Sequence, residues 1–432
     1  MSDPGPVTAA ERIGSLDVLR GVAILGILVM NIYAFAMPFP GAYMNPLLMG
    51  GTDNLNVGTW MVTHIVVDQK FLSIFAMLFG AGIVLMTSKA AQSGKSYGRL
   101  FFRRQSWLIL FGALHAYFIW VGDILFLYAF VGMLAYLFRN RSPRMLLVIA
   151  CLLLPITQLM MLGFAAMTDQ FEAAVTEISI RQDAGETLTA EEQEQLESWA
   201  AMEQMSRPNA DHMRQDVEQH LGSYTEILKH RIPAAIFMQI GMIFMMIWRV
   251  TALMLLGMVL MKTGIFAAEK SAGFYRNMML VAYGLGFPLT IYSAFDLKAH
   301  DFDPGYAAGV GAIANYYGSI IVGLGHVALV LLLIKSGAVS NLLRRFAAVG
   351  RMALTNYLMH SIILTTVFYG YGLGLYGSVS RFGQMGFVLA VIALQLIYSP
   401  WWLERFRFGP FEWLWRSLTY WQRQPMLRQE SS

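Results

Sequence analysis

About ten apolar stretches, each of roughly 20 residues, restrict the folds open to this chain more than any other feature of its sequence. They fall at residues 18–38, 66–87, 106–122, 124–138, 145–165, 249–266, 277–296, 312–334, 352–374 and 384–402. A helix of that length crosses a bilayer, and within lipid the backbone must satisfy its own hydrogen bonds. Only 13% of the residues are charged, against the roughly 25% typical of soluble domains. We therefore predict an all-α polytopic membrane protein with about ten transmembrane helices in a single domain, residues 1–432.

One further apolar segment, residues 232–248, has no obvious place in this scheme. Arg249 follows it and could end it at a membrane interface. The segment is either an interfacial helix or an eleventh element that is tilted or re-entrant.

Basic residues recur in every second loop and predict the orientation of the chain. They are Lys89, Lys95, Arg99, Arg103, Arg104, Arg139, Arg141, Arg144, Lys262, Lys270, Arg276, Lys335, Arg344, Arg345 and Arg351. Loops rich in Lys and Arg stay in the cytoplasm, so both termini are expected there, with residues 403–432 as a cytoplasmic tail. The loop at 40–58 has no Lys or Arg and should be external. Helical spans of this kind indicate the bacterial inner membrane.

The longest connection, residues 167–231, is rich in Glu, Gln, Asp and Ala. Thr189 followed by Glu192 is a capping box and predicts the start of an amphipathic helix. We expect this segment to be an external helical insertion. It could be a lid over an external site or a solvated acidic hairpin without a catalytic part.

The first apolar stretch carries Asp17, Arg20 and Asn31 on one helical face, because Arg20 and Asn31 are separated by nearly whole turns. A charge near the bilayer centre costs on the order of 3 kcal/mol or more, so this face should point into the protein. Asp17 and Arg20 form either a structural ion pair or a site for a charged ligand. Asn31 is either a packing hydrogen bond or a site residue.

Two histidines are expected near mid-membrane. At 1.5 Å per residue, His115 lies roughly 16 Å above Arg104, and His360 roughly 14 Å above Arg351. Asn356 precedes His360 by one turn and shares its face. An imidazole can exchange a proton near neutral pH, so one at this depth is a candidate for chemistry.

Further polar residues lie where spans leave the external face. His64 and Asp68 are one turn apart, Lys70 follows, and Asp123 stands at the external end of the span that contains His115. Asp68 and Lys70 could pair with each other, or Lys70 could extend outward. His326 has no polar neighbours in the sequence and is predicted to be structural. Nucleotide-binding and zinc motifs are absent, so we predict no metal site.

Five sequence blocks resemble a known family: SLDVLRGVAILGILVMNI, DQKFLSIFAMLFGAGIVL, RRQSWLILFGALHAYFIWVGDILF, GRMALTNYLMHSIILTTVFYGYGLGLYG and FRFGPFEWLWRSLTYW. Together they are similar to the bacterial YeiB-like proteins, whose membrane domain has no assigned function. The first block also resembles transmembrane acyltransferases, namely the acyltransferase-3 proteins and heparan-α-glucosaminide N-acetyltransferase.

The acyltransferase resemblance implies roles for particular residues. Asn31 and Asp68 match two positions of the acetyltransferase pattern, but Gly58 stands where its loop histidine would be, so His115 would have to replace that residue. YeiB-like chains often carry Gln where His360 stands, which weakens a catalytic role for His360.

These patterns lead to one main hypothesis, a membrane-embedded acyltransferase. It would move an acyl group from a cytoplasmic carrier such as acetyl-CoA, a cosubstrate rather than a covalently bound cofactor, to an external sugar or lipid acceptor. His115 would be the base or transient acyl acceptor, Asp68 would orient it, and Asn31 would stabilise the oxyanion. The candidate substrate- or carrier-binding residues are Asp17, Arg20, Lys70, Asp123, Asn356 and His360.

Two other classes stay open. A transporter or lipid-handling protein could use the same polar residues as a pathway. A structural or sensory membrane protein would need no turnover. The expected partners are the lipid bilayer, the acyl carrier and the acceptor, together with a second copy in a homodimer, and not nucleic acid.

Overall fold

A computed structural model describes residues 14–39, 41–92, 97–206 and 210–428. Lys95, one of the basic loop residues, lies outside these ranges, as do 1–13 and 429–432 at the two ends of the predicted domain. Over the described ranges the regular elements are helices, and Phe406 and Leu427 form an isolated β-bridge. The predicted all-helical fold is therefore confirmed.

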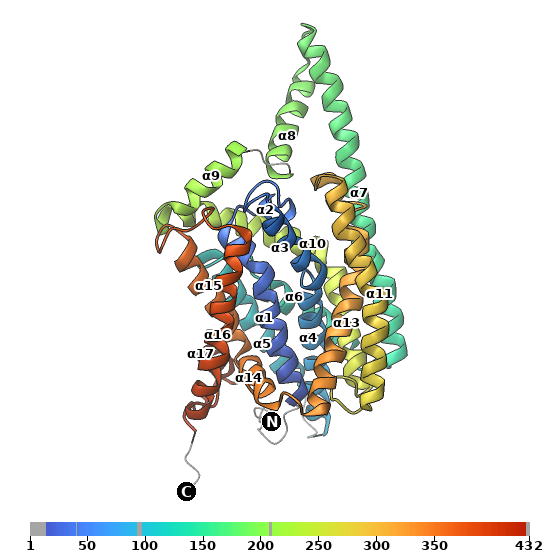
Figure 1. The fold of residues 1–432 in the computed structure, drawn as a ribbon, viewed down its shortest axis with the longest axis vertical. Coiled ribbons are helices and arrows are strands. Elements are labelled where there is room, and N and C mark those ends of the chain that lie inside the picture. Colours follow the sequence, from blue (N-terminus) through green and yellow to red (C-terminus); the bar gives the residue numbers. More distant parts are fainter. Residues whose placement is uncertain (1–13, 40, 93–96, 207–209, 429–432) are drawn as a thin grey trace.

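The helices run in the following order (Figure 1): α1 Gly14–Ala36, α2 Gly41–Met44, α3 Asn54–Val66, α4 Lys70–Gln92, α5 Gly98–Phe118, α6 Leu125–Ala135 continued by the 3-10 turn η2 Tyr136–Phe138, α7 Pro143–Asp183, α8 Ala190–Ser206, α9 Ala210–Leu221, α10 Tyr224–Lys262, α11 Ala272–Ala299, α12 Pro304–Ala308, α13 Ala312–Ser336, α14 Ser340–Arg351, α15 Ala353–Phe368, α16 Arg381–Arg405 and α17 Pro410–Tyr420.

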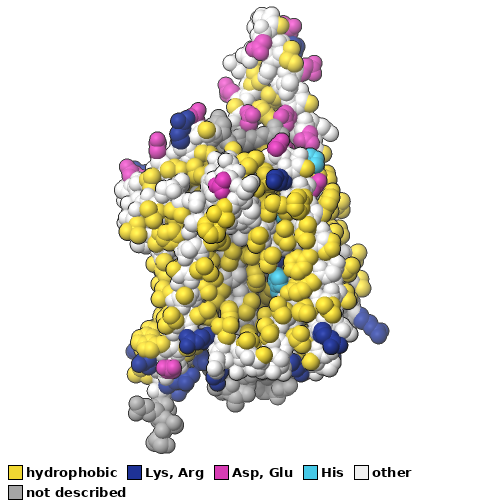
Figure 2. Space-filling model, viewed as in Figure 1, with side chains coloured by type: hydrophobic (Ala, Val, Ile, Leu, Met, Phe, Trp, Pro, Cys, Tyr) yellow, Lys and Arg dark blue, Asp and Glu magenta, His cyan; other side chains and the backbone are white. Residues whose placement is uncertain are grey.

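Seven helical segments of the described chain are long and apolar enough to cross a membrane. They are α1, α3 with α4, α7, α10, α11, α13 and α16. The predicted spans at 124–138 and 352–374 correspond to the shorter apolar helices α6 and α15. Hydrophobic side chains cover a wide band across the bundle on the face drawn in Figure 2. These features are those of a membrane protein.

Close contact between helices depends on small residues. A Cβ added to Gly80 of α4 would lie 1.9 Å from the Met254 carbonyl oxygen, and one added to Gly257 of α10 would lie 1.8 Å from that of Met77. Only glycine allows the two backbones to approach so closely, as is common where helices pack in lipid.

The segment 232–248 is not a separate element, contrary to both interpretations of the sequence. It is part of the continuous helix α10, which passes through Arg249 and ends at Lys262. Arg249 is buried. Its Nη2 donates to Ser319 Oγ at 2.9 Å, and its guanidinium lies 4.2 Å from the centre of the Tyr316 ring. An arginine with such partners can sit inside the bundle and so does not end the helix.

The polar connection 167–231 contains the end of α7, all of α8 and α9, and the start of α10. The α7–α8 hairpin projects beyond the bundle (Figure 1). The predicted capping box is confirmed, because Glu192 N donates to Thr189 Oγ1 at 3.2 Å and Thr189 N donates to Glu192 Oε2 at 2.8 Å. Acidic side chains gather at this end of the molecule and basic ones at the opposite end (Figure 2).

Residues 410–420, within the predicted tail, form α17 and pack against the bundle. Trp415 Nε1 donates to the Arg104 carbonyl of α5 at 2.9 Å. The Glu412 carboxylate accepts from Thr355 N at 3.0 Å and from Thr355 Oγ1 at 2.5 Å. This part of the tail is therefore an integral piece of the fold.

Candidate functional site

A buried chain of three polar side chains links α5, the turn that follows it, and α15. His115 Nδ1 lies 2.7 Å from Asp123 Oδ2, and His115 Nε2 lies 2.8 Å from Ser361 Oγ. With the carboxylate ionised and the imidazole neutral, Nδ1 carries the hydrogen that is donated to Asp123, and Nε2 accepts from the Ser361 hydroxyl. All three side chains are buried. The arrangement is that of a carboxylate, an imidazole and a hydroxyl in acyl-transfer enzymes.

The turn between α5 and α6 holds Asp123 in place. Its Oδ1 accepts from Phe126 N at 2.8 Å, in the first turn of α6. Tyr357, one turn before Ser361 on α15, accepts from Ile124 N at 3.2 Å through its hydroxyl oxygen. The same helix therefore supplies the hydroxyl to His115 and fixes the turn that carries the carboxylate.

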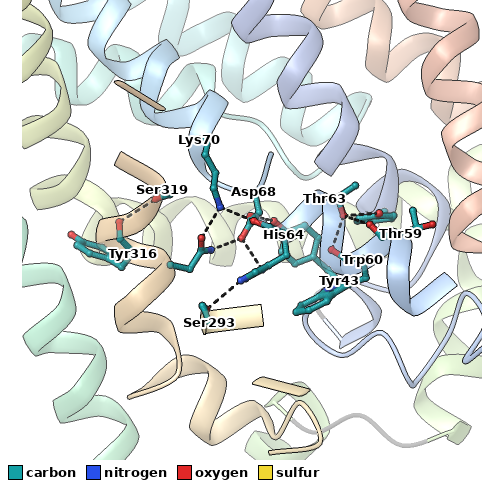
Figure 3. A network of polar contacts seen from close by, with 12 residues as sticks. Tyr43, Thr59, Trp60, Thr63, His64, Asp68, Lys70, Ser293, Tyr316 and Ser319 are labelled. Atoms are coloured by element: carbon teal, nitrogen blue, oxygen red, sulfur yellow. Dashed lines mark hydrogen bonds and ion pairs between the residues drawn. The ribbon is translucent and has the colours of Figure 1, made fainter. Parts of the chain in front are cut away.

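A second polar network surrounds Asp68 in the turn between α3 and α4 (Figure 3). Asp68 Oδ1 accepts from the Tyr43 hydroxyl at 2.8 Å, and Oδ2 accepts from Asn315 Nδ2 at 2.8 Å. Lys70 Nζ donates to Asn315 Oδ1 at 2.7 Å and to the His64 carbonyl at 2.6 Å. Asn315 of α13 thus bridges a buried carboxylate and a fully buried ammonium.

His64 joins this network on the α11 side. Its Nε2 lies 3.2 Å from Ser293 Oγ, its Nδ1 lies 3.5 Å from Asp68 Oδ2, and its ring stacks on Trp60 at 4.8 Å between centroids. Gln69, between the two charged residues, has a φ of 59°. This left-handed backbone forms the tight turn from which Asp68 and Lys70 reach the same cluster.

Known protein sequences match this chain over nearly its whole length. A family model described as a protein of unknown function, DUF418, matches residues 260–422. The chain is 32% identical over 447 residues to the uncharacterized protein YxaH of Bacillus subtilis (strain 168), with 99% of each chain covered. It is 28% identical over 419 residues to the uncharacterized protein YeiB of Escherichia coli (strain K12), with 95% of this chain and 96% of YeiB covered.

The chain belongs to the YeiB-like family. An uncharacterized 39.9 kDa protein from Bacillus acidopullulyticus is 26% identical over 425 residues, with 98% of each chain covered. No solved structure matches the chain significantly. Asn315 and Ser361 lie inside the matched family segment, whereas Asp68 and His115 lie outside it. Both polar networks of the YeiB-like fold therefore join its first half to its second.

The structure corrects the expected meeting of Asn31, Asp68 and His115. Asp123, not Asp68, is hydrogen-bonded to His115, because the short turn after α5 brings Asp123 back over the imidazole. Asp68 is held instead by Tyr43 and Asn315. Asn31 is half-buried on α1, and its side chain forms no hydrogen bond with the described residues. Lys70 does not extend outward, since it is fully buried.

Asn356 and His360 point toward α16 rather than toward His115. Asn356 Oδ1 accepts from the Tyr398 hydroxyl at 2.7 Å, and His360 Nε2 lies 2.9 Å from Gln395 Oε1. Ser361, the next residue, is turned by about 100° and therefore reaches α5. Sequence reasoning missed Ser361, although its place beside His360 at the expected depth of His115 was a usable signal.

The remaining predicted residues have local partners. Asp17 and Arg20 form the expected ion pair, 2.9 Å between Arg20 Nη1 and Asp17 Oδ1, at the end of α1 remote from α2. His326 is held by the Tyr283 hydroxyl at 2.8 Å and by the Val66 carbonyl at 2.9 Å, as expected of a structural histidine.

Proposed function

We propose that this YeiB-like protein is a membrane-embedded acyltransferase that moves an acyl group from a cytoplasmic carrier such as acetyl-CoA to an externally presented acceptor. The observation that supports this proposal is the Asp123–His115–Ser361 chain, in which one buried imidazole is hydrogen-bonded to both a carboxylate and a hydroxyl. Asp68, His64 and Ser293 repeat the same order of groups, but at 3.5 and 3.2 Å their contacts are longer than the 2.7 and 2.8 Å of the Asp123–His115–Ser361 chain. The shorter chain therefore has the better geometry to make a hydroxyl nucleophilic.

The proposed reaction has two steps. In the first, Ser361 Oγ attacks the thioester carbonyl, its proton passes to His115 Nε2, and the C–S bond breaks as that proton goes to the leaving thiolate. In the second, the acceptor hydroxyl attacks the acyl-serine ester and gives its proton to His115, which returns one to Ser361. Asp123 stays ionised and stabilises the imidazolium formed in each step.

The topology proposed for this function has ten spans and both termini in the cytoplasm of a bacterial inner membrane. Adding α5, α6 and α15 to the seven long apolar segments brings the count to ten. The gathering of Lys and Arg at the end with α14 and α17 supports a cytoplasmic position for that end (Figure 2). The Asp17–Arg20 end of α1 would then face the carrier, and the α7–α8 hairpin would lie outside.

The test is turnover by purified protein in nanodiscs supplied with radiolabelled acyl-CoA of several chain lengths. We expect label on the protein at an early time, and no label in Ser361→Ala or His115→Ala. Ser399→Ala and His360→Gln are matched controls, because Ser399 of α16 and His360 of α15 are buried and hydrogen-bonded in the contact between these two helices. Absence of transfer from every carrier, or equal labelling of Ser361→Ala, would refute the acyltransferase.

The buried Asp68–Lys70 network favours a second candidate, a transporter or lipid-handling protein. Ionisable groups inside a membrane domain commonly mark a substrate or ion pathway. Its test first replaces Cys151, the single cysteine of the sequence, by alanine and then introduces Asn31→Cys, which is labelled by an impermeant thiol reagent from each side in turn. Labelling that changes side with added substrate would support this candidate, whereas labelling from one side only would contradict alternating access.

A further inference from the structure

Arg381, the first residue of α16, is completely buried and forms no ion pair with a carboxylate of the described residues. Its Nη2 donates to the Ala42 carbonyl at 2.9 Å and to the Met49 carbonyl at 3.1 Å. Its guanidinium carbon lies 4.6 Å from the centre of the Tyr33 ring. The Nε and Nη1 atoms are buried and have no hydrogen-bond partner among the described residues. A guanidinium whose neighbours are two neutral carbonyls and a tyrosine, with two nitrogens that make no hydrogen bond of normal geometry to the described residues, is under-compensated for its burial.

Gln384, close to Arg381 in the sequence, contributes a third polar atom without a partner among the described residues. This atom is its Oε1, and the residue is fully buried one turn along α16. The first N–H groups of α16 are occupied, because Arg381 N donates to Gly50 O and Phe382 N to Asn56 Oδ1, both at 2.8 Å. Hydrogen bonds to a ligand would therefore come from the two side chains, in the positive field of the helix start.

Both carbonyls that accept from the Arg381 side chain belong to one stretch, residues 41–51, which we call the outer segment, while the Tyr33 ring lies against the guanidinium from α1. Ala42 and Met49 of the outer segment accept from Arg381, and Tyr43 of the same segment donates to Asp68. The outer segment ends at Gly50 and Gly51, with φ of 95° and 96°, which glycine adopts without strain. A movement of the outer segment away from Arg381 would therefore also break the hydrogen bond from Tyr43 to Asp68.

We propose that Arg381 binds an oxyanion that also carries a hydroxyl group, the chemistry of phosphoglycerol, and that binding opens the outer segment. The oxyanion replaces the carbonyls of Ala42 and Met49, because hydrogen bonds to a charged acceptor are roughly twice as strong as those to a neutral one. The ligand hydroxyl donates to Gln384 Oε1. The inference does not depend on acyl transfer, since binding needs no acyl donor.

The experiment follows amide hydrogen exchange of the outer segment in the full chain, held in phosphatidylcholine nanodiscs. The probes are glycerol phosphate in solution, phosphatidylglycerol added to the nanodisc, and glycerol as the neutral control. We expect a saturable rise in exchange over residues 41–51 with at least one phosphate probe and none with glycerol. A response to phosphatidylglycerol alone identifies a lipid headgroup as the source, and a response to glycerol phosphate identifies a free ligand. No response to either overturns the proposal.

Variants decide whether Arg381 carries the response. Arg381→Lys should weaken the apparent affinity about tenfold or more, and Arg381→Gln should abolish the response. Arg231→Gln is the matched control, because Arg231 is another buried arginine whose Nη1 donates to a carbonyl, that of Phe118, at 3.1 Å. An unchanged response in Arg381→Gln, or its loss in Arg231→Gln, contradicts the assignment. If the Arg381 variants do not fold, equal exchange with glycerol phosphate, phosphatidylglycerol and glycerol in the wild type still overturns it.

Discussion

Replacing Lys70 by methionine removes the buried ammonium of the Asp68 network while keeping a long apolar side chain. In the wild type, Lys70 Nζ donates to Asn315 Oδ1 and to the His64 carbonyl, while Asn315 Nδ2 donates to Asp68. The variant leaves both acceptors without their donor. It also leaves the Asp68 carboxylate buried without a nearby positive charge in its own network.

The expected cost follows from that burial. Removing one member of a buried charged pair destabilises a protein by about 3–5 kcal/mol, since the remaining charge stays desolvated. Lys70 is 0% exposed and Asp68 6% exposed, so solvent offers little screening. Asp68→Asn alone should lower the free energy of unfolding by a similar amount, because it leaves the Lys70 ammonium buried without a nearby negative charge in this network. The double variant removes both charges, and we expect a favourable coupling of about 2 kcal/mol relative to the sum of the single changes.

The assay is reversible unfolding in mixed micelles, in which the proportion of a denaturing detergent is raised stepwise and unfolding is followed by the fluorescence of the ten tryptophans. The four members of the cycle are the wild type, Lys70→Met, Asp68→Asn and the double variant. Lys335→Met is the control, because Lys335 is exposed at the end of α13 and should change the free energy of unfolding by less than about 0.5 kcal/mol. If the changes in the free energy of unfolding caused by Lys70→Met and Asp68→Asn simply add in the double variant, the reasoning is refuted, because the two charges would then not interact.

Three further outcomes are expected. Asp123→Asn should lower acyl transfer by about 10²–10⁴-fold without unfolding the protein, because the amide no longer favours the Nδ1–H form of His115; unchanged turnover in the nanodisc assay would exclude this role for Asp123. Burial raises the pKa of Glu412, outside the spans, so its contribution to stability is present below the unfolded-state pKa and is lost as pH rises through the folded-state pKa. Thermal midpoints measured between acidic and alkaline pH should show this loss in the wild type and not in Glu412→Gln, and identical profiles would contradict it. Gly257→Leu should separate α4 from α10 and prevent a stable fold, because even a Cβ would lie 1.8 Å from the Met77 carbonyl oxygen; a wild-type unfolding curve for this variant would contradict the close packing.

Local patterns in the sequence were sufficient for the features that depend on near neighbours. Apolar stretches predicted the helical membrane fold, because lipid leaves the backbone few alternatives. The Thr189–Glu192 capping box and the Asp17–Arg20 pair join residues three positions apart, and the structure confirms both. In contrast, the segment before Arg249 was misread, because the partners that bury this arginine lie on α13.

The sequence by itself determined which residues are polar in an apolar chain and where each one stands along its helix. It could not determine partners, because a helix at a given depth can present a side chain to any of several neighbours. Tertiary structure alone turned Ser361 toward His115 and His360 toward Gln395, although the two residues are adjacent. It also assigned Asp123 to His115 and Asn315 to Asp68, since the helix packing decides which groups come within hydrogen-bond distance.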